Sequence, residues 1–243
     1  MPCRIFLAGA AGAVGKRMIP LLRDAGHTVV GTTRSTAKAE TLRSLGVEPV
    51  LVNVFDADLL VRAIEAARPD VVIHQLTDLP KDLDPGLMKA AVVRNARIRD
   101  EGTRNLVRAA NAAGVRRLVA QSIGWAYAPG PEPHAESDPL DAAAQGDRGI
   151  TVRGVIALED WTLKSPPLVG LVLRYGQLYG PGTHSDKPSK LAPVHVDAAA
   201  YAAVLAIDRG EGGPYNIAQP NMHIATHKAR AKLGWDPDFR MSP

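Results

Sequence analysis

Short apolar runs and amphipathic segments alternate along this sequence. Residues 5–8 form the first apolar run, and from residue 13 to residue 25 apolar side chains recur at the spacing of one helical face. A short apolar run bounded by turn residues is typical of a strand buried on both faces of a parallel sheet, and helical amphipathicity is typical of the helices that cover such a sheet. These residues therefore predict a strand, a turn and a helix.

The same alternation continues through most of the chain. Further strands are predicted at residues 28–32, 50–52, 71–73, 117–121, 171–174 and 215–218. Helices are predicted after Ser35 and Asp56, both good N-cap residues, and over residues 87–113, 151–164 and 198–207. Strands that alternate with helices indicate an α/β fold with a doubly wound parallel sheet.

The junction between the first strand and the first helix is rich in glycine, with Gly9, Gly12 and Gly15 at three-residue spacing. Glycine permits a tight turn and a close approach of the backbone to a pyrophosphate, and the free amides of a helix N-terminus attract phosphate. We therefore expect this turn to bind a dinucleotide. Its predicted coenzyme contacts are Gly9, Ala11, Gly12, Ala13, Val14 and Gly15.

The end of the second predicted strand carries no acidic residue. A site for NAD(H) usually places a carboxylate there to bind the ribose hydroxyls. This chain has Thr33 and Arg34 instead, and Lys38 lies one helical turn beyond Arg34. A guanidinium can pair with a 2′-phosphate, so the sequence favours NADP(H), with NAD(H) still possible. An Arg34 side chain that stacks on the adenine or faces solvent is the alternative.

Other polar residues follow the later strands, at the edge where a doubly wound sheet binds its ligand. We expect Asn53 and Val54 to meet the adenine, and His74 to fill a structural hydrogen-bonding role. Ser122 and Tyr127 follow the fifth strand and are expected at the mouth of the crevice. Residues predicted to line the ribose and nicotinamide side are Gln75, Leu76 and Thr77.

Composition and charge exclude several other classes of protein. The net charge is +4, but lysines and arginines are scattered and no stripe of basic and aromatic residues is present, so a nucleic-acid partner is not expected. The single cysteine, Cys3, excludes an intramolecular disulfide and is typical of a reducing compartment. His223 and His227 share a helical spacing but lack a third ligand, so no metal site is predicted.

The chain starts directly on the first predicted strand, without a charged and apolar leader. No apolar run reaches the ~18 residues that a membrane span needs. We therefore expect a cytoplasmic protein with no membrane partner.

Several short motifs occur together in a characteristic order. They are Gly9–Gly15, Val72-Ile73-His74, Asn95 with Gly102-Thr103-Arg104-Asn105, Tyr179-Gly180-Pro181-Gly182, His195-Val196-Asp197 and Tyr215-Asn216-Ile217. Together they resemble the NAD(P)-dependent epimerase/dehydratase family, the extended short-chain dehydrogenases. The resemblance implies a seven-stranded Rossmann sheet over residues 1–180, with a small C-terminal substrate region over 181–243 that is interleaved with the core. It also implies a coenzyme contact at Asn95 and a homodimer formed through helices near 87–113 and 151–164.

The family resemblance also implies a catalytic serine or threonine, a tyrosine and a lysine, with the lysine four residues after the tyrosine. None of the five tyrosines here has a lysine four residues later. Alignment on Glu159 puts Thr151 at the tyrosine position and Val155 at the lysine position. The usual spacing back from Tyr127 puts Ile123 at the serine position, with Ser122 one residue earlier. The usual proton relay is therefore predicted to be lost or rebuilt.

Two functions fit these observations. The first is an oxidoreductase of the epimerase/dehydratase type that transfers hydride to or from a small carbonyl, hydroxyl or sugar-like substrate, with Tyr127 as substitute acid and Ser122 as a hydrogen-bond donor. The alternative is a sensor that binds NADP(H) without catalysis, which the missing relay favours. For Tyr127, a packing role and a catalytic role are both open.

Overall fold

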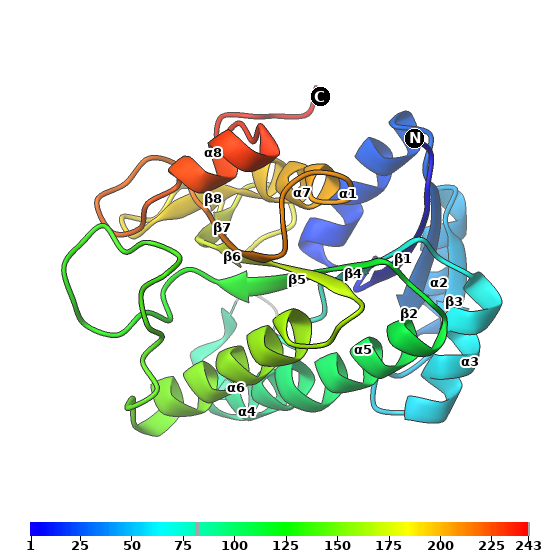
Figure 1. Cartoon of the computed structure of the whole chain (residues 1–243), viewed down its shortest axis with the longest axis horizontal. Helices are drawn as coiled ribbons and strands as arrows, with labels where there is room; N and C mark the ends of the chain where they lie inside the picture. The colour runs from blue at the N-terminus through cyan, green and yellow to red at the C-terminus, as the bar shows by residue number, and fades with distance from the viewer. Residues whose placement is uncertain (81–82, 243) are drawn as a thin grey trace.

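The computed structural model describes residues 1–80 and 83–242. Seven parallel strands form a central sheet in the order β3-β2-β1-β4-β5-β6-β9, and helices cover both of its faces (Figure 1). The order reverses between β1 and β4, as in a doubly wound sheet. The predicted α/β class and the predicted seven-stranded parallel sheet are both confirmed.

The first half of the chain follows the predicted pattern closely. Its elements are β1 (Arg4–Ala8), α1 (Ala13–Asp24), β2 (Thr28–Thr33), α2 (Thr36–Ser44), β3 (Glu48–Leu51), α3 (Ala57–Ala67) and β4 (Val71–His74). Both predicted N-caps are confirmed, since Ser35 Oγ accepts a hydrogen bond from the Lys38 amide and Asp56 Oδ1 accepts one from the Leu59 amide.

The second half departs from the prediction at several elements. Its elements are α4 (Pro85–Arg97), η2 (Ile98–Gly102), α5 (Thr103–Ala112), β5 (Arg117–Ile123), α6 (Gly146–Leu163), β6 (Val169–Tyr175), β7 (Gln177–Tyr179), β8 (Pro193–His195), α7 (Val196–Leu205), β9 (Gly213–Ile217) and α8 (His227–Leu233). The helix predicted over 87–113 contains a π-helical turn, η2, at its middle. The helix predicted from residue 151 begins earlier, at Gly146. Its first turn could not be recognised in the sequence, because it consists mainly of glycine and charged residues and has no apolar pattern.

Alternate side chains of each strand supply two separate cores. Ile5 and Leu7 of β1 pack with α1 and α7 on one face of the sheet, whereas Phe6 and Ala8 pack with α3 and α5 on the other. Helices α4 and α6 lie on that second face, at the bottom of Figure 1. This two-sided burial explains why the strand reads as a continuous apolar run.

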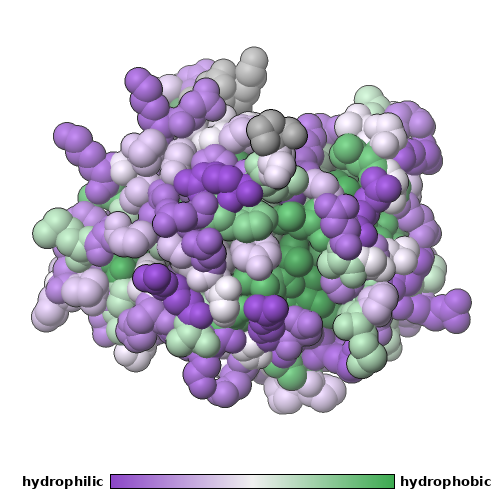
Figure 2. Space-filling model, turned by 90° about the horizontal axis from the view of Figure 1, so that it is seen from above, coloured by the Kyte–Doolittle hydropathy of each residue, from purple (hydrophilic) through white to green (hydrophobic). Residues whose placement is uncertain are grey.

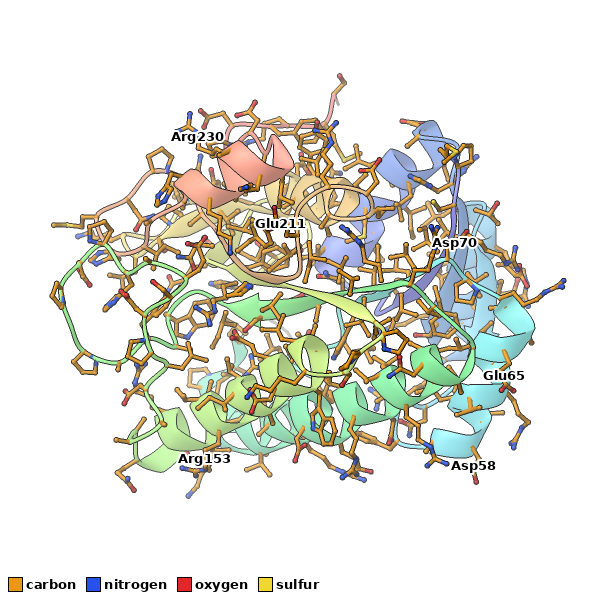
Figure 3. All side chains as sticks on the ribbon, in the orientation of Figure 1. Asp58, Glu65, Asp70, Arg153, Glu211 and Arg230 are labelled. Carbon is orange, nitrogen blue, oxygen red and sulfur yellow. The ribbon has the colours of Figure 1, made fainter. Side chains whose placement is uncertain are left out.

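The surface of the molecule is largely polar. Charged side chains such as Asp58, Glu65 and Arg153 project outward from helices α3 and α6 (Figure 3). The view from above, on the side of α7 and α8, shows an apolar area among charged residues (Figure 2). Partly buried apolar side chains on this side include Tyr201, which stacks on Phe239. In the described part of the chain, no helix is long and apolar enough to cross a membrane.

The region predicted to be a small C-terminal unit contributes to the central sheet. Strand β9 pairs with β6 at the sheet edge, and α7 packs on the same face as α1. Strands β7 and β8 form a separate two-stranded sheet. The division at residue 180 stays a prediction.

Candidate coenzyme-binding cleft

A cleft opens at the carboxyl ends of β1, β2, β3 and β4, next to the point where the strand order reverses. The described residues that line it are Ala8, Gly9, Ala11, Gly12, Thr32, Thr33, Arg34, Ser35, Lys38, Val52, Asn53, Val54, Phe55, Leu60, Gln75, Leu76, Thr77, Ile98 and Leu106. Open α/β sheets bind their ligands at this position. Eleven of the fifteen predicted coenzyme contacts lie in this lining.

The glycine turn has the geometry that close packing requires. Gly9 has φ +93°, and a Cβ there would lie 2.6 Å from the carbonyl oxygen of Gln75. A Cβ on Gly15 would overlap the carbonyl oxygen of Gly9. Gly12 is the N-cap of α1 and has no side chain to cap the first amides, which are therefore available to an anion.

The remaining residues of the predicted turn lie behind this surface. Ala13, Val14 and Gly15 form the first turn of α1 and are absent from the described lining of the cleft. Val14 and Gly15 are buried, so they shape the turn through packing. Any contact of these three residues with a coenzyme stays a prediction.

One end of the cleft is basic. Arg34 and Lys38 are exposed there, and neither forms an ion pair with another described residue. No acidic residue occurs among the described lining residues. The Thr33 hydroxyl accepts a hydrogen bond from the Ser35 amide at 3.1 Å and so fixes the turn that presents Arg34.

The loop after β3 is held by the helix that contains η2. Asn105 Nδ2 donates to the Val54 carbonyl at 2.9 Å, and the Arg97 guanidinium lies over the Phe55 ring, 4.0 Å from its centroid. Ile98 and Leu106 from the same helical stretch complete the floor of the cleft. Neither residue was predicted as part of the site, because a π-helical turn leaves no signal in the apolar periodicity of the sequence.

His74 fixes the loop after β4. Its Nδ1 accepts a hydrogen bond from the Leu76 amide at 3.2 Å, which leaves the proton on Nε2, 3.1 Å from Thr103 Oγ1. Burial, aided by the positive charge of Arg99, lowers the pKa of His74 to about 4. The imidazole is therefore neutral near pH 7, and the predicted structural role of His74 is confirmed.

Asn95 lies close to this loop but outside the described lining of the cleft. Its Oδ1 accepts from the Asp78 amide at 3.0 Å, and its Nδ2 donates to the carbonyls of Asp78 and Ala91. The side chain is thus occupied in holding the segment after Thr77. A contact between Asn95 and a coenzyme stays a prediction.

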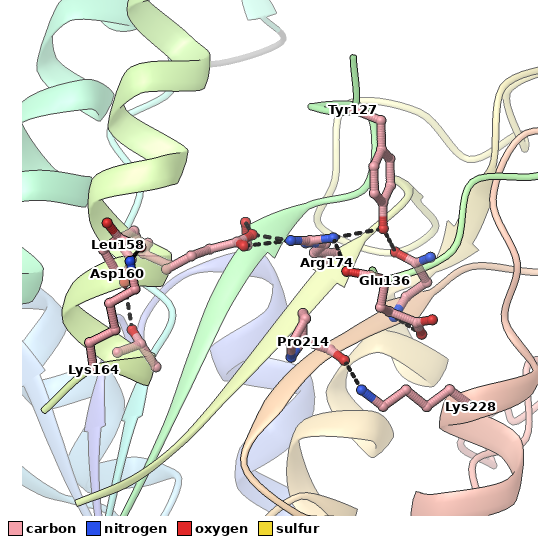
Figure 4. A network of polar contacts seen from close by, with 12 residues as sticks. Tyr127, Glu136, Leu158, Asp160, Lys164, Arg174, Pro214 and Lys228 are labelled. Carbon is pink, nitrogen blue, oxygen red and sulfur yellow. Dashed lines mark hydrogen bonds and ion pairs between the residues drawn. The ribbon is translucent and has the colours of Figure 1, made fainter. Parts of the chain in front are cut away.

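Tyr127 belongs to a buried polar network around Arg174 (Figure 4), and Ser122 joins this network through Glu159. Arg174 pairs with Glu159 at 2.7 Å and donates to the Tyr127 hydroxyl at 2.8 Å. Tyr127 in turn donates to Asn216 Oδ1 at 2.7 Å, and Ser122 Oγ donates to Glu159 Oε1 at 2.9 Å. Burial raises the pKa of Tyr127, although Arg174 opposes that shift.

These positions correct one expectation. Ser122 and Tyr127 were expected at the mouth of the crevice, but their side chains are buried, with exposed fractions of 0% and 5% for the residues. Neither belongs to the described lining of the cleft. Tyr127 is covered by the segment from 128 to 145, in which His134 stacks on its ring and Glu136 joins the network, whereas Ser122 faces Glu159 of α6. Their catalytic roles stay a prediction.

Comparison with known proteins identifies the family. The profile described as "NAD dependent epimerase/dehydratase family" matches residues 5–212. The chain belongs to this family. Among the described residues, the glycine turn and the cleft beside it are the features that the epimerase/dehydratase fold uses to hold a nicotinamide dinucleotide.

The relatives include proteins with different reactions. The 3-diazoavenalumate denitrifying reductase of a Streptomyces species is 40% identical over 260 residues, which cover 97% of this chain and 80% of that protein. A UDP-glucose 4-epimerase of Mycolicibacterium smegmatis is 32% identical over 151 residues, which cover 58% of this chain and 46% of that protein.

Solved epimerase structures share the fold. The UDP-glucose 4-epimerase of Thermotoga maritima superposes with a TM-score of 0.78 at 19% identity, over 98% of this chain and 94% of that chain. The enzyme WbmG of Bordetella bronchiseptica, in complex with NAD, gives a TM-score of 0.75 at 21% identity, over 99% and 91% of the two chains. At these identities the likeness establishes the fold alone.

Two of the three positions at which the resemblance implies the relay of this epimerase/dehydratase family carry apolar side chains here. Ile123, at the expected serine position, and Val155, at the expected lysine position, belong to one buried cluster together with Ala126, Ala144 and Val152. Thr151, at the expected tyrosine position, is half-buried on α6. A cluster of this composition has no group that can donate or accept a proton.

Proposed function

We propose that this family member is a reductase that uses NAD(P)H to deliver hydride to an electrophile, in a reaction that needs no proton from the family's relay. The observation that carries the proposal is the contrast between two parts of the molecule. The cleft retains the glycine turn and its free helix amides, while Ile123 and Val155 fill the relay positions with buried apolar side chains.

The residues of the cleft fit a dinucleotide. The α1 amides after Gly12 would hold the pyrophosphate, and Asn53 with Val54 would border the adenine. Exposed Arg34 and Lys38, with no acidic residue among the described lining, support a preference for NADP(H). When bound, the reduced nicotinamide supplies a hydride. The protein's own contribution is to bind, orient and keep water from the reacting carbon.

The missing relay suggests a substrate class. Reduction of a carbonyl adds a hydride to carbon and a proton to oxygen, so it requires a proton donor. Reductive loss of nitrogen from an aryl diazonium adds a hydride to the ring system and releases N₂, with no proton needed to balance the step. The relative named as a denitrifying reductase of a diazo compound is 40% identical to this chain. We propose an aryl diazonium compound as the substrate.

One assay distinguishes the proposed reductase from a carbonyl reductase and from a sensor. The protein is mixed with NADPH and either a benzenediazonium carboxylate or a panel of aldehydes and ketones, and nicotinamide absorbance is followed. Oxidation with the diazonium alone supports the proposal. Oxidation with carbonyl compounds alone contradicts it and favours a carbonyl reductase in which Tyr127 is the acid. Saturable NADPH binding without oxidation favours the sensor.

The assay needs a control for the direct reaction of diazonium salts with NADPH. Gly9→Ala places a Cβ 2.6 Å from the Gln75 carbonyl at a positive φ, so it should disrupt the cleft. Gly114→Ala also has a positive φ but meets no atom within 4 Å. The proposal requires that Gly114→Ala keeps the enzymatic rate while Gly9→Ala falls to the protein-free rate.

We also propose a homodimer through the outer surfaces of α4 and α6. These helices lie side by side on one face of the molecule (Figure 1). Val93 of α4 and Trp161 of α6 have exposed fractions of 54% and 37%. Sedimentation at micromolar concentration tests this, and a monomer would contradict it.

A further inference from the structure

Gln75 occupies an unusual position in the cleft. It follows β4 directly, lines the cleft, and is only 5% exposed. Its carbonyl oxygen lies so close to Gly9 that no side chain fits between them. The residue therefore sits where the glycine turn meets the second half of the sheet.

The side-chain amide of Gln75 is only half satisfied. Its Nε2 donates to the Tyr175 hydroxyl at 3.3 Å, whereas its Oε1 is buried and has no hydrogen-bond partner among the described residues. Rotating the side-chain amide by 180° would exchange its two polar atoms, so that Nε2 instead of Oε1 would have no hydrogen-bond partner. A buried polar atom without a partner destabilises a fold, so a native example calls for an explanation.

The anchor of this amide is rigid. Tyr175 stands at the end of β6 and is only 1% exposed, within the core on the α1 and α7 side. The Gln75 amide thus links β4 to β6, across β5. A doubly wound sheet binds the two halves of a dinucleotide on opposite sides of its switch point, and Arg34 and Asn53 lie on the β1–β3 side. Gln75 lies on the β4–β6 side, which is the side of the nicotinamide nucleoside.

We propose that the Gln75 side chain is a recognition element for the nicotinamide nucleoside half of the coenzyme, with Oε1 accepting a hydrogen bond from a ribose hydroxyl or from the carboxamide nitrogen. Tyr175 is a positioning residue, because it holds the amide from behind. This inference rests on the proposed binding of NAD(P)H and extends it from the backbone of the cleft to a specific side chain.

Binding measurements on Gln75→Met test the proposal. Methionine has nearly the same shape but lacks both polar atoms of the amide. We expect the dissociation constant for NADPH, measured by calorimetry, to rise about 5- to 20-fold, as for the loss of one hydrogen bond. Affinity for adenosine bisphosphate, which is the adenine half alone, should stay within about twofold. The midpoint of thermal unfolding without ligand should change little, since the substitution removes one unpaired buried atom, Oε1, but leaves the Tyr175 hydroxyl without its partner.

A matched control and a third ligand sharpen the result. Asn111 Oδ1 is also buried without a partner, but Asn111 does not line the described cleft, so Asn111→Leu should leave NADPH affinity unchanged. ADP-ribose carries both riboses without the nicotinamide ring. If Gln75→Met weakens ADP-ribose binding as well, the donor is a ribose hydroxyl; if it weakens only NADPH binding, the donor is the carboxamide.

Two results would overturn the inference. One is an unchanged NADPH affinity in Gln75→Met. The other is an equal loss of affinity for NADPH and adenosine bisphosphate together with a lower unfolding midpoint, which would mean a purely structural role. If the unaltered protein showed no saturable binding of either nicotinamide coenzyme, the proposed function itself would fail, and that outcome is visible before any variant is measured.

Discussion

Ile123 and Val155 pack in the same buried cluster, with exposed fractions of 6% and 0%. They come from the end of β5 and the middle of α6, the two elements from which the family resemblance implies a serine and a lysine. Two apolar side chains of one cluster thus stand where the resemblance implies two polar groups, and this part of the molecule is apolar.

Restoring the lysine alone should destabilise the protein. In Val155→Lys, an ammonium would enter the apolar cluster without a partner, which we expect to lower the free energy of unfolding by about 3 kcal/mol or more. Urea unfolding measures this. Arg153→Lys introduces a lysine at an exposed position of the same helix and should change stability by less than about 0.5 kcal/mol. A Val155→Lys variant as stable as the parent would show that this site is open and polar.

Arg34 should determine the preference between coenzymes. Arg34→Ala is expected to weaken NADPH binding by about 10- to 100-fold, because a charge-assisted pair with the 2′-phosphate is lost, and to leave NADH binding nearly unchanged. Arg43→Ala removes the same charge from α2 at a position that does not line the described cleft, and should leave both affinities as they were. Equal effects of Arg34→Ala on both coenzymes would contradict a 2′-phosphate site.

His74 should make the fold sensitive to acid. Its pKa of about 4 in the folded protein lies below the ordinary value of 6.5, because burial disfavours the charged form. The unfolded chain therefore binds more protons than the folded chain between those two values, and stability is lost as the pH falls from about 6.5 to 4. The expected slope from this group is about 1.4 kcal/mol per pH unit.

The pH dependence can be assigned to His74 by substitution. His74→Asn keeps an acceptor for the Leu76 amide but does not titrate, so its stability should fall less steeply over the same range. Unfolding by urea at a series of pH values gives both curves. Parallel curves for the two proteins would assign the acid sensitivity to other groups.

Tyr127→Phe separates the two interpretations of this tyrosine. Loss of the hydroxyl leaves Arg174 and Asn216 with unpaired buried atoms, so we expect a loss of about 1–3 kcal/mol in stability. Hydride transfer in the folded variant should continue within about twofold. Tyr179→Phe serves as the control. It removes another hydroxyl that donates one hydrogen bond, to Gln219, and accepts one, from Arg240. Abolished transfer with unchanged coenzyme affinity would make Tyr127 the proton donor.

The strands and the coenzyme turn could be predicted because local sequence determines them. Apolar runs define the strands, and Gly9 stands where the backbone needs a positive φ and a close approach. The placement of Tyr127 could not be predicted in this way. Its partners Arg174 and Asn216 are distant in sequence, and the loop that covers it has no periodicity. The unpaired Oε1 of Gln75 could not be predicted either, because it results from the packing of the Gln75 side chain, which follows β4, against Tyr175 of β6.

The most direct test of a relay-free hydride transfer is to trace the transferred hydrogen. The protein is given NADPH deuterated at the transferable position and an aromatic diazonium compound in ordinary water, and the product is analysed by mass spectrometry. A relay-free transfer predicts one deuterium at the carbon that carried nitrogen, with a rate that does not change when the pH is varied through the neutral range. A product whose new hydrogen comes from water would contradict it.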